Sequence, residues 1–167
     1  MKLTIKGFRG KQKKLIEKAI PYYLEVLVGP RLTNNLMVHV INLPKKERDQ
    51  TQADIVWEDS NYKPREFTIR IDNGLKIRPL LMGLAHECVH IKQFARGEWV
   101  HLLKNGAQKW QGVILPEGID YWDNPAEIEA YGRELGLFFR FIKAAGYDNE
   151  TWAQFDDHYE PQPTRKL

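Results

Sequence analysis

The chain has 167 residues, of which 43% are hydrophobic and 28% are charged, the proportions of a globular protein with one well-packed domain. No apolar run approaches the length that spans a membrane, and the N-terminus has neither a hydrophobic signal region nor a cleavage site. The single cysteine, Cys88, cannot form an internal disulfide, so the composition gives no indication of an oxidising compartment. We therefore expect a soluble, cytoplasmic protein with no membrane partner.

The net charge is only +3, but the charges are unevenly distributed. Residues 1–18 contain seven Lys or Arg and one acid, whereas residues 117–160 contain eleven Asp or Glu and three basic residues. A basic start of this kind contacts nucleic acid or an acidic partner in some proteins and is the solvated face of a first helix in most. No nucleic-acid-binding motif accompanies it, so we interpret it as a solvated face and keep nucleic acid as the lesser alternative.

The first half of the chain is predicted to form four strands and one helix. Alternation and β-branched residues predict strands over residues 3–6, 36–43, 53–58 and 66–71. Apolar residues at helical spacing predict a helix over residues 10–27, and Pro21 within it indicates a kink or an early end.

A helix over residues 79–96 follows the last of these strands directly. It begins with Pro79, ends before Gly97 and is apolar on nearly every side, as a buried helix is. The Asn105-Gly106 pair, with Trp99 and Trp110 on its flanks, then predicts a hairpin.

The rest of the chain contains a second long helix. After an irregular stretch over residues 111–123, it opens at residues 124–127 and runs to about residue 145, where Gly146 ends it. A short helix near residues 150–155 and a polar tail over about 157–167 complete a single domain, residues 1–167, without repeats or a linker. The predicted apolar face of the long helix consists of Ile128, Tyr131, Leu135, Phe138, Phe139 and Ile142.

The helix over residues 79–96 contains His86-Glu87-x-x-His90, the HExxH pattern. Residues i and i+4 lie one turn apart on one face of a helix, so both imidazoles can reach a single metal ion. Glu87 stands about 100° round the axis, which suits a carboxylate that takes a proton from metal-bound water. Two histidines and a glutamate in a buried helix need such a reason, because unpaired buried polar groups are costly. The pattern therefore predicts a metal site.

Two histidines do not complete a catalytic zinc site, which usually has three protein ligands and a water. The extended pattern HExxHxxGxxH fails, because Gln93 and Arg96 occupy its Gly and His positions. The remaining candidates downstream of His90 are His101, Glu117, Glu127, Glu129 and His158.

Helix geometry favours Glu127 over Glu129, since the two lie about 200° apart round the axis and cannot both face the metal. Glu127 is about 70° from the centre of the predicted apolar face, and Glu129 is about 130° from it. Glu129 also stands four residues before Arg133, the spacing of a surface ion pair. Another role for Glu127 stays open, because Asn124-Pro-Ala-Glu127 also fits a capping box in which the glutamate reaches back to the helix start.

The segments His86-Glu87-Cys88-Val89-His90 and Glu127-Ile128-Glu129-Ala130-Tyr131 resemble the zincin metallopeptidases that take a glutamate as third ligand, the gluzincins. The chain most resembles the small single-domain members found in bacterial and phage genomes. The resemblance covers about residues 53–145. It implies an α+β fold in which a short mixed or antiparallel sheet of three or four strands packs on the HExxH helix, followed by a hairpin and the Glu-bearing helix. Matching Ala130 to the alanine of related motifs again selects Glu127. Those motifs have Asp or Asn where this chain has Tyr131, so the hydrogen bond from that position to a ligand histidine does not carry over.

The function that follows is that of a zinc-dependent metallopeptidase, a hydrolase acting on a peptide or protein substrate. Zinc would be held by His86, His90 and Glu127, and Glu87 would be the general base. Tyr121 is the leading candidate for a donor to the developing oxyanion, ahead of His101 and His158. The resemblance further implies that the strand over residues 66–71 edges the cleft and binds an extended peptide by strand addition.

Two other functions stay open. One is a metal-binding zincin scaffold that is not a protease and acts as a regulatory or partner-binding protein. Glu87 favours catalysis over this, because a structural zinc site needs no such carboxylate and is usually closed by four Cys or His ligands. The other is a nucleic-acid-associated protease similar to the SprT-like group, whose usual third histidine ligand counts against it.

Overall fold

The computed structural model of the chain describes residues 1–47, 51–59, 62–102 and 107–154. The polar tail and the Asn105-Gly106 turn lie outside these residues. In chain order the elements are β1 (Lys2–Lys6), α1 (Gly10–Val28), α2 (Pro30–Thr33), β2 (Met37–Asn42), the 3-10 turn η1 (Lys45–Glu47), β3 (Ala53–Trp57), β4 (Glu66–Ile71), α3 (Ile77–Arg96), β5 (Trp99–His101), β6 (Gln108–Trp110), β7 (Val113–Ile114), the 3-10 turn η2 (Tyr121–Asp123) and α4 (Pro125–Ala145).

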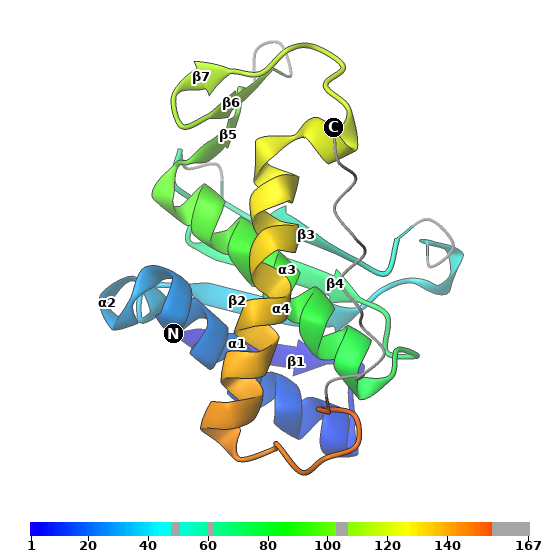
Figure 1. The fold of residues 1–167 in the computed structure, drawn as a ribbon. Helices are drawn as coiled ribbons and strands as arrows, with labels where there is room; N and C mark the ends of the chain where they lie inside the picture. Colours follow the sequence, from blue (N-terminus) through cyan, green and yellow to red (C-terminus); the bar gives the residue numbers. More distant parts are fainter. Residues whose placement is uncertain (48–50, 60–61, 103–106, 155–167) are drawn as a thin grey trace, which may run out of the picture.

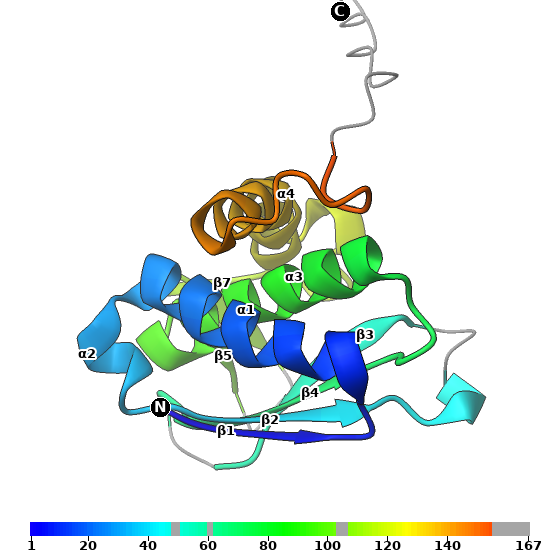
Figure 2. The same cartoon turned by 90° about the horizontal axis from the view of Figure 1, so that it is seen from below.

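A four-stranded sheet forms one layer of the molecule, and helices cover one of its faces. The strand order is β1-β2-β4-β3, with β1, β2 and β4 parallel and β3 antiparallel to β4. Helices α1 and α3 lie side by side on the sheet, and α4 packs on their outer side (Figures 1 and 2). The helix α3 is therefore enclosed between the sheet and α4. None of the described helices is long and apolar enough to cross a membrane.

Alternation along the strands separates the core from an open polar face. In β4, Phe67, Ile69 and Ile71 are fully buried beneath the helices. The residues between them carry hydrogen bonds on the other face, where Arg70 binds Asp54 through two nitrogens. The expected α+β architecture and its small mixed sheet are thus confirmed.

The order of strands corrects one expectation. The segment 66–71 was expected to edge the cleft, but as β4 it lies inside the sheet between β2 and β3. The chain turns back between β3 and β4, so the antiparallel strand β3 takes the outer position. Among the described residues no further strand pairs with β3 on its other side.

Two helix predictions need correction, and a third is confirmed. The helix α3 begins at Ile77, two residues before Pro79. The helix predicted over residues 10–27 is confirmed as α1, which does not end early at Pro21 but continues to Val28. No helix forms over residues 147–154, which consist of turns and bends, and the last residue of that prediction, Phe155, lies outside the described chain.

The apolar face predicted for α4 is only partly buried. Phe138 and Ile142 lie in the core, but Ile128, Tyr131 and Leu135 are exposed. The first two turns are buried instead through small side chains, Ala126 and Ala130, which allow α4 to approach α3 closely.

Gly83 sets the distance between α3 and the sheet, one turn before the histidines. A Cβ atom at this position would lie 3.2 Å from Cδ1 of Ile71 and 3.9 Å from Cβ of Ala53. A side chain here would therefore press α3 away from β3 and β4, and with it the residues that face β3.

We expect Gly83→Val to lower the free energy of unfolding by about 1–3 kcal/mol, because the added methyl groups overpack this contact. The matched control is Gly132→Val in α4, where a Cβ atom would have no neighbour within 4 Å. Since valine is no worse than glycine in a helix, that variant should be close to neutral. Urea unfolding of both checks the prediction, and equal effects would contradict it.

Candidate metal centre

The helix α3 places His86 and His90 one turn apart on the side that faces α4. Both are buried, with 8% and 4% of their surface exposed, and their Nε2 atoms lie 3.1 Å apart. Buried polar atoms without hydrogen-bond partners are costly. The two imidazoles can be buried here because neighbouring side chains bind them.

The first turn of α4 brings Glu127 to the two imidazoles. Its Oε2 atom lies 3.3 Å from Nε2 of His86 and 3.5 Å from Nε2 of His90. The capping-box alternative is not realised: Oδ1 of Asn124 accepts the N–H of Ala126, and the N–H of Asn124 donates to the carbonyl of Tyr121. The carboxylate of Glu127 therefore faces the histidines.

Hydrogen bonds at the far nitrogens orient both rings. Nδ1 of His86 lies 2.9 Å from Oε2 of Glu134, and Nδ1 of His90 lies 2.8 Å from Oε1 of Gln93. Because both partners are acceptors, each neutral ring carries its proton on Nδ1 and directs the lone pair of Nε2 toward Glu127. Oε2 of Glu127 is itself buried without a hydrogen bond from the described residues. When both rings are neutral, three lone pairs thus converge on one point, and a proton on Nε2 of His86 would point at Glu127 instead.

The spacing of these atoms fits a metal ion. Their separations of 3.1, 3.3 and 3.5 Å form a nearly equilateral triangle. A tetrahedral ion with bonds of about 2.0–2.1 Å needs donors about 3.3–3.4 Å apart. Within the described part of the chain, His86, His90 and Glu127 form the one group of potential metal ligands (His, Cys, Asp or Glu) whose ligand atoms lie close enough together to hold an ion.

The electrostatics show how strongly the cluster attracts positive charge. Burial alone would lower the pKa of His86, but Glu127 and Glu134 raise it to about 9. Burial alone would raise the pKa of Glu127, but the imidazoles of His86 and His90 hold it well below its usual range. A proton held here is displaced when a metal binds, because a ligand histidine must be neutral.

Glu129 has a different set of partners. Its carboxylate accepts hydrogen bonds from Nζ of Lys92 at 2.6 Å, Nε of Arg133 at 2.8 Å and Nε2 of Gln93 at 3.0 Å. It therefore does not join the cluster. Of the other candidates for a third ligand, His101 lies among aromatic rings, Glu117 is exposed and His158 is outside the described residues.

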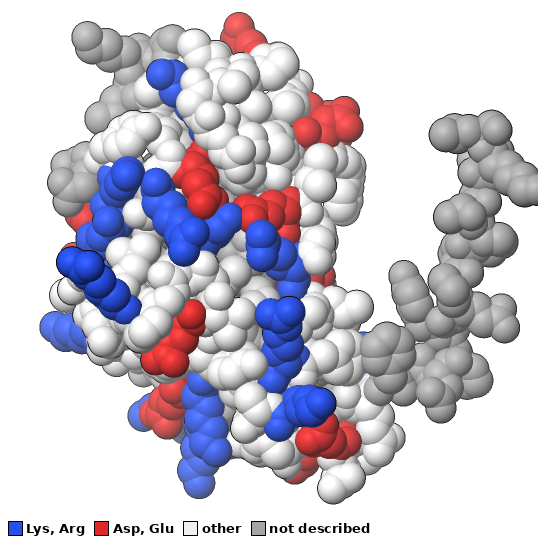
Figure 3. Space-filling view, turned by 60° about the vertical axis from the view of Figure 1, so that its left-hand side comes forward, with Lys and Arg blue, Asp and Glu red and all other residues white. Residues whose placement is uncertain are grey.

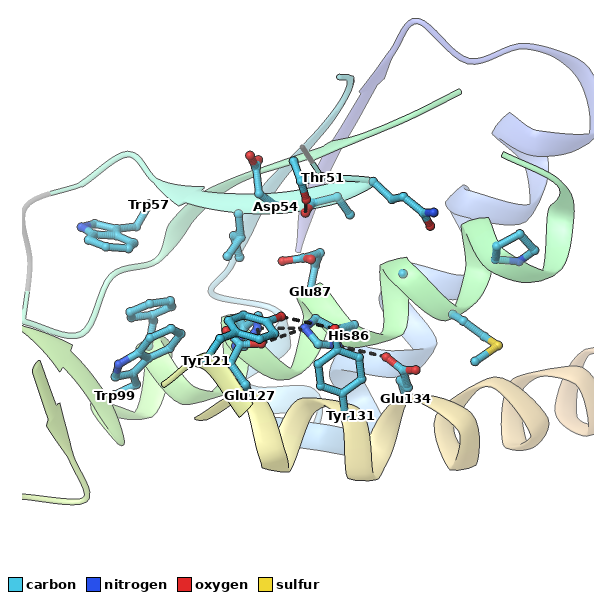
Figure 4. Close-up of a pocket in the computed structure, with 18 of the residues that line it drawn as sticks. Thr51, Asp54, Trp57, His86, Glu87, Trp99, Tyr121, Glu127, Tyr131 and Glu134 are labelled. Carbon is cyan, nitrogen blue, oxygen red and sulfur yellow. Dashed lines mark hydrogen bonds and ion pairs between the residues drawn. The ribbon is translucent and has the colours of Figure 1, made fainter. Parts of the chain in front are cut away.

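A cleft of about 740 Å³ opens in front of the cluster, between β3 and the start of α4. Glu87 projects from α3 into this space toward β3 (Figure 4), and burial raises the pKa of its carboxyl to about 7. Tyr121 stands on the opposite rim, where its hydroxyl lies 3.3 Å from that of Tyr131. Burial, together with hydrogen bonding to Tyr131 and Glu127, raises the pKa of Tyr121.

Two residues that hold the histidines were missed from sequence. Glu134 stands seven residues after Glu127, two turns along the same face of α4, and takes the contact that Tyr131 cannot make. Tyr131 instead places its ring edge-on to His86, with centroids 4.7 Å apart. Gln93 stands three residues after His90 and bridges to α4 by donating to the carbonyl of Ala126 at 2.9 Å. Both residues could have been identified from sequence, because a residue seven positions after Glu127, or three after His90, lies on the same face of its helix.

The basic N-terminal segment is partly neutralised within the molecule. Lys11 pairs with Glu150 at 2.7 Å, and Lys13 lies 3.9 Å from Glu17. On the face shown in Figure 3, Lys and Arg side chains are interspersed with Asp and Glu and with uncharged surface.

Comparison of the chain with protein-family models, curated proteins and solved structures gives no match. Its function is therefore inferred from its own side chains.

We expect Gln93→Ala to lower the free energy of unfolding of the metal-free protein by about 2–4 kcal/mol. The substitution removes the buried hydrogen-bond partner of both His90 and the carbonyl of Ala126. The control is Gln52→Ala, at an exposed glutamine, which should change stability by less than about 0.5 kcal/mol. Chemical denaturation checks both, and a neutral Gln93→Ala would show that the bridge between α3 and α4 does not contribute.

Proposed function

We propose that this chain is a zinc-dependent metallopeptidase whose metal ligands are His86, His90 and Glu127. The observation that carries the proposal is the buried triangle formed by Nε2 of His86, Nε2 of His90 and Oε2 of Glu127, whose edges are 3.1, 3.3 and 3.5 Å long. Two neutral imidazoles and one carboxylate match a catalytic zinc site, which has three protein ligands and leaves the fourth position open. The cleft in front of them supports an open site rather than a structural one.

Glu87 is the general base in this proposal. Zinc in such a site lowers the pKa of a bound water and polarises a carbonyl group. Glu87 accepts the proton of the attacking water and then delivers it to the nitrogen of the leaving amine. The carboxylate of Glu87 lines the cleft beside the three ligands, so it is placed to perform both transfers. Tyr121 is the proposed donor to the oxygen on which negative charge develops, since it lies on the cleft rim beside Glu127.

The proposed substrate is an extended peptide that lies along β3. The N–H of Glu58 donates to the carbonyl of Glu66, and the N–H of Asp72 donates to that of Gln52. In an antiparallel pair such residues alternate with ones whose backbone groups point away from the partner strand. The backbone groups of β3 that point away from β4 therefore belong to Ala53, Ile55 and Trp57, all of which line the cleft. The carbonyl of Ala53 accepts the hydroxyl of Thr51 at 2.6 Å, so the groups of Ile55 and Trp57 are the ones offered to a peptide. A peptide can add there as a further strand.

We expect the purified protein to contain about one zinc ion per chain. We also expect Glu127→Ala to weaken zinc binding by more than about 100-fold, since loss of a residue that only hydrogen-bonds to a ligand typically costs about 10–100-fold. Glu129→Ala, two residues away, is the matched control and should weaken binding by no more than about tenfold through Gln93. Metal analysis and competition with a zinc chelator measure both. Protein purified without chelator that holds no zinc would contradict the proposal.

We expect Glu87→Gln to retain zinc and to lower peptide hydrolysis by about 10²–10⁴-fold, because the amide keeps the shape of the side chain but cannot accept the proton. Cleavage of a mixture of unstructured peptides, followed by mass spectrometry, provides the assay. If the variant holds zinc and still cleaves at the wild-type rate, Glu87 is not the base. If wild-type protein holds zinc and cleaves nothing, the metal-binding scaffold without protease activity becomes the better description.

A further inference from the structure

One end of the cleft is walled by four rings from three elements, which we call the aromatic wall: Trp57 at the end of β3, Phe94 on α3, and Trp99 and His101 on β5. Neighbouring rings are in contact, with centroid separations of 4.6 Å for Trp57 and Phe94, 4.8 Å for Phe94 and Trp99, and 5.0 Å for Trp57 and His101. The rings thus form one continuous apolar surface rather than scattered side chains.

The aromatic wall adjoins the candidate metal centre on one side only. The ring of Trp99 lies 5.3 Å from that of His90. Away from the wall the cleft is lined by Thr51, Gln52 and Glu134 together with Pro79 and Met82. In Figure 4, Trp57 and Trp99 lie at one end, and Glu134 lies on the far side of Glu127 from them. The two sides therefore differ in chemistry, so a bound chain meets the aromatic wall on one side of the metal centre and a mixture of polar and aliphatic groups on the other.

The wall is held in place before any ligand binds. Phe94 and Trp99 stack with an interplanar angle of 17°, and Nε1 of Trp99 donates to Oε1 of Gln108 at 3.1 Å. Trp57 is only partly buried, and it stands at the free edge of β3 where a peptide strand would add. Side chains fixed in this way lose little entropy when they bind a ligand.

The wall also carries no charge. Burial lowers the pKa of His101, so its ring is neutral at pH 7, and its Nε2 atom has no hydrogen-bond partner among the described residues. Within the described part of the chain no ion pair involves any of the four side chains, and none of them could neutralise an acidic ligand. A carboxylate placed against the wall would lose hydration without gaining a partner.

We propose that the aromatic wall is the specificity subsite of the cleft and that it selects an aromatic or large aliphatic side chain of the peptide substrate. This inference rests on the proposed function, because it takes the peptide to lie along β3. Ring contacts and burial of a side chain such as phenylalanine are together worth one to two orders of magnitude in selectivity over alanine. An acidic residue is disfavoured at the same position.

Binding to the zinc-loaded Glu87→Gln protein tests the subsite without turnover. The probes are capped polyalanine hexapeptides in which one central residue is alanine, phenylalanine, leucine, lysine or aspartate, and calorimetry gives each Kd. We expect the phenylalanine and leucine peptides to bind at least about tenfold more tightly than the alanine peptide and the aspartate peptide to bind more weakly. A preference for lysine or aspartate, or no preference, overturns the proposal.

Variants in β3 identify the wall as the source of the preference. In the same Glu87→Gln background, Trp57→Ala should reduce the tenfold advantage of phenylalanine to less than about threefold. Val56→Ala is the matched control, since Val56 is 41% exposed on the other side of β3 and does not line the cleft, and it should leave the advantage unchanged. Trp57→Met keeps bulk at the sheet edge and serves if Trp57→Ala does not fold. An advantage that survives both Trp57 substitutions overturns the subsite.

The two proposals can fail separately. If wild-type protein cleaves peptides but binding does not depend on the varied residue, the subsite is wrong and the peptidase stands. If phenylalanine is preferred in binding and the preference depends on Trp57, while the zinc-loaded wild-type protein cleaves nothing, the subsite stands as a peptide-binding site and the peptidase is wrong.

Discussion

The meeting of two imidazole nitrogens and one carboxylate oxygen between α3 and α4 is the constraint on which the rest of the molecule depends. The three atoms lie 3.1–3.5 Å apart. When both rings are neutral their lone pairs repel, so the arrangement persists only if the surrounding structure holds it or a proton or metal ion satisfies it. Gln93 and Glu134 orient the imidazole rings. The sheet and α4 enclose α3, so the two Nε2 atoms and the carboxylate oxygen cannot turn toward water. The packing of three layers is therefore what keeps three acceptors together.

The local part of this site could be predicted from sequence because it depends on one helical turn. His86 and His90 share a face at any i, i+4 spacing, and the separation of Glu127 from Glu129 follows from helical geometry. The partners at Nδ1 were not foreseen, because their identity depends on how α4 is placed against α3. Family motifs directed attention to Tyr131, one turn too early, whereas the longer side chain of Glu134 reaches His86 from the next turn.

The strand order and the buried face of α4 could not be predicted, for two physical reasons. Hydrophobic alternation shows which side of a strand is buried but not which strand lies beside it. The expectation that residues 66–71 edge the cleft came from the resemblance to zincins, and alternation could not test it. On α4, the spacing of large apolar residues placed Ile128, Tyr131 and Leu135 on the predicted buried face, but these residues are exposed. Contact with α3 is made instead by Ala126 and Ala130, because small residues allow the close approach that the shared site requires.

The start of α4 resolves a conflict between capping and ligation that the sequence left open. Glu127 stands in the first turn, where a carboxylate is stabilised by the positive end of the helix dipole whether or not it caps a backbone N–H. Asn124 supplies the cap through Ala126 and leaves both oxygens of Glu127 without that duty. The helix terminus thus favours the charged form of Glu127, and the two imidazoles favour it further. An acidic residue placed there is held ionised and directed inward, which is the state that a metal ligand needs.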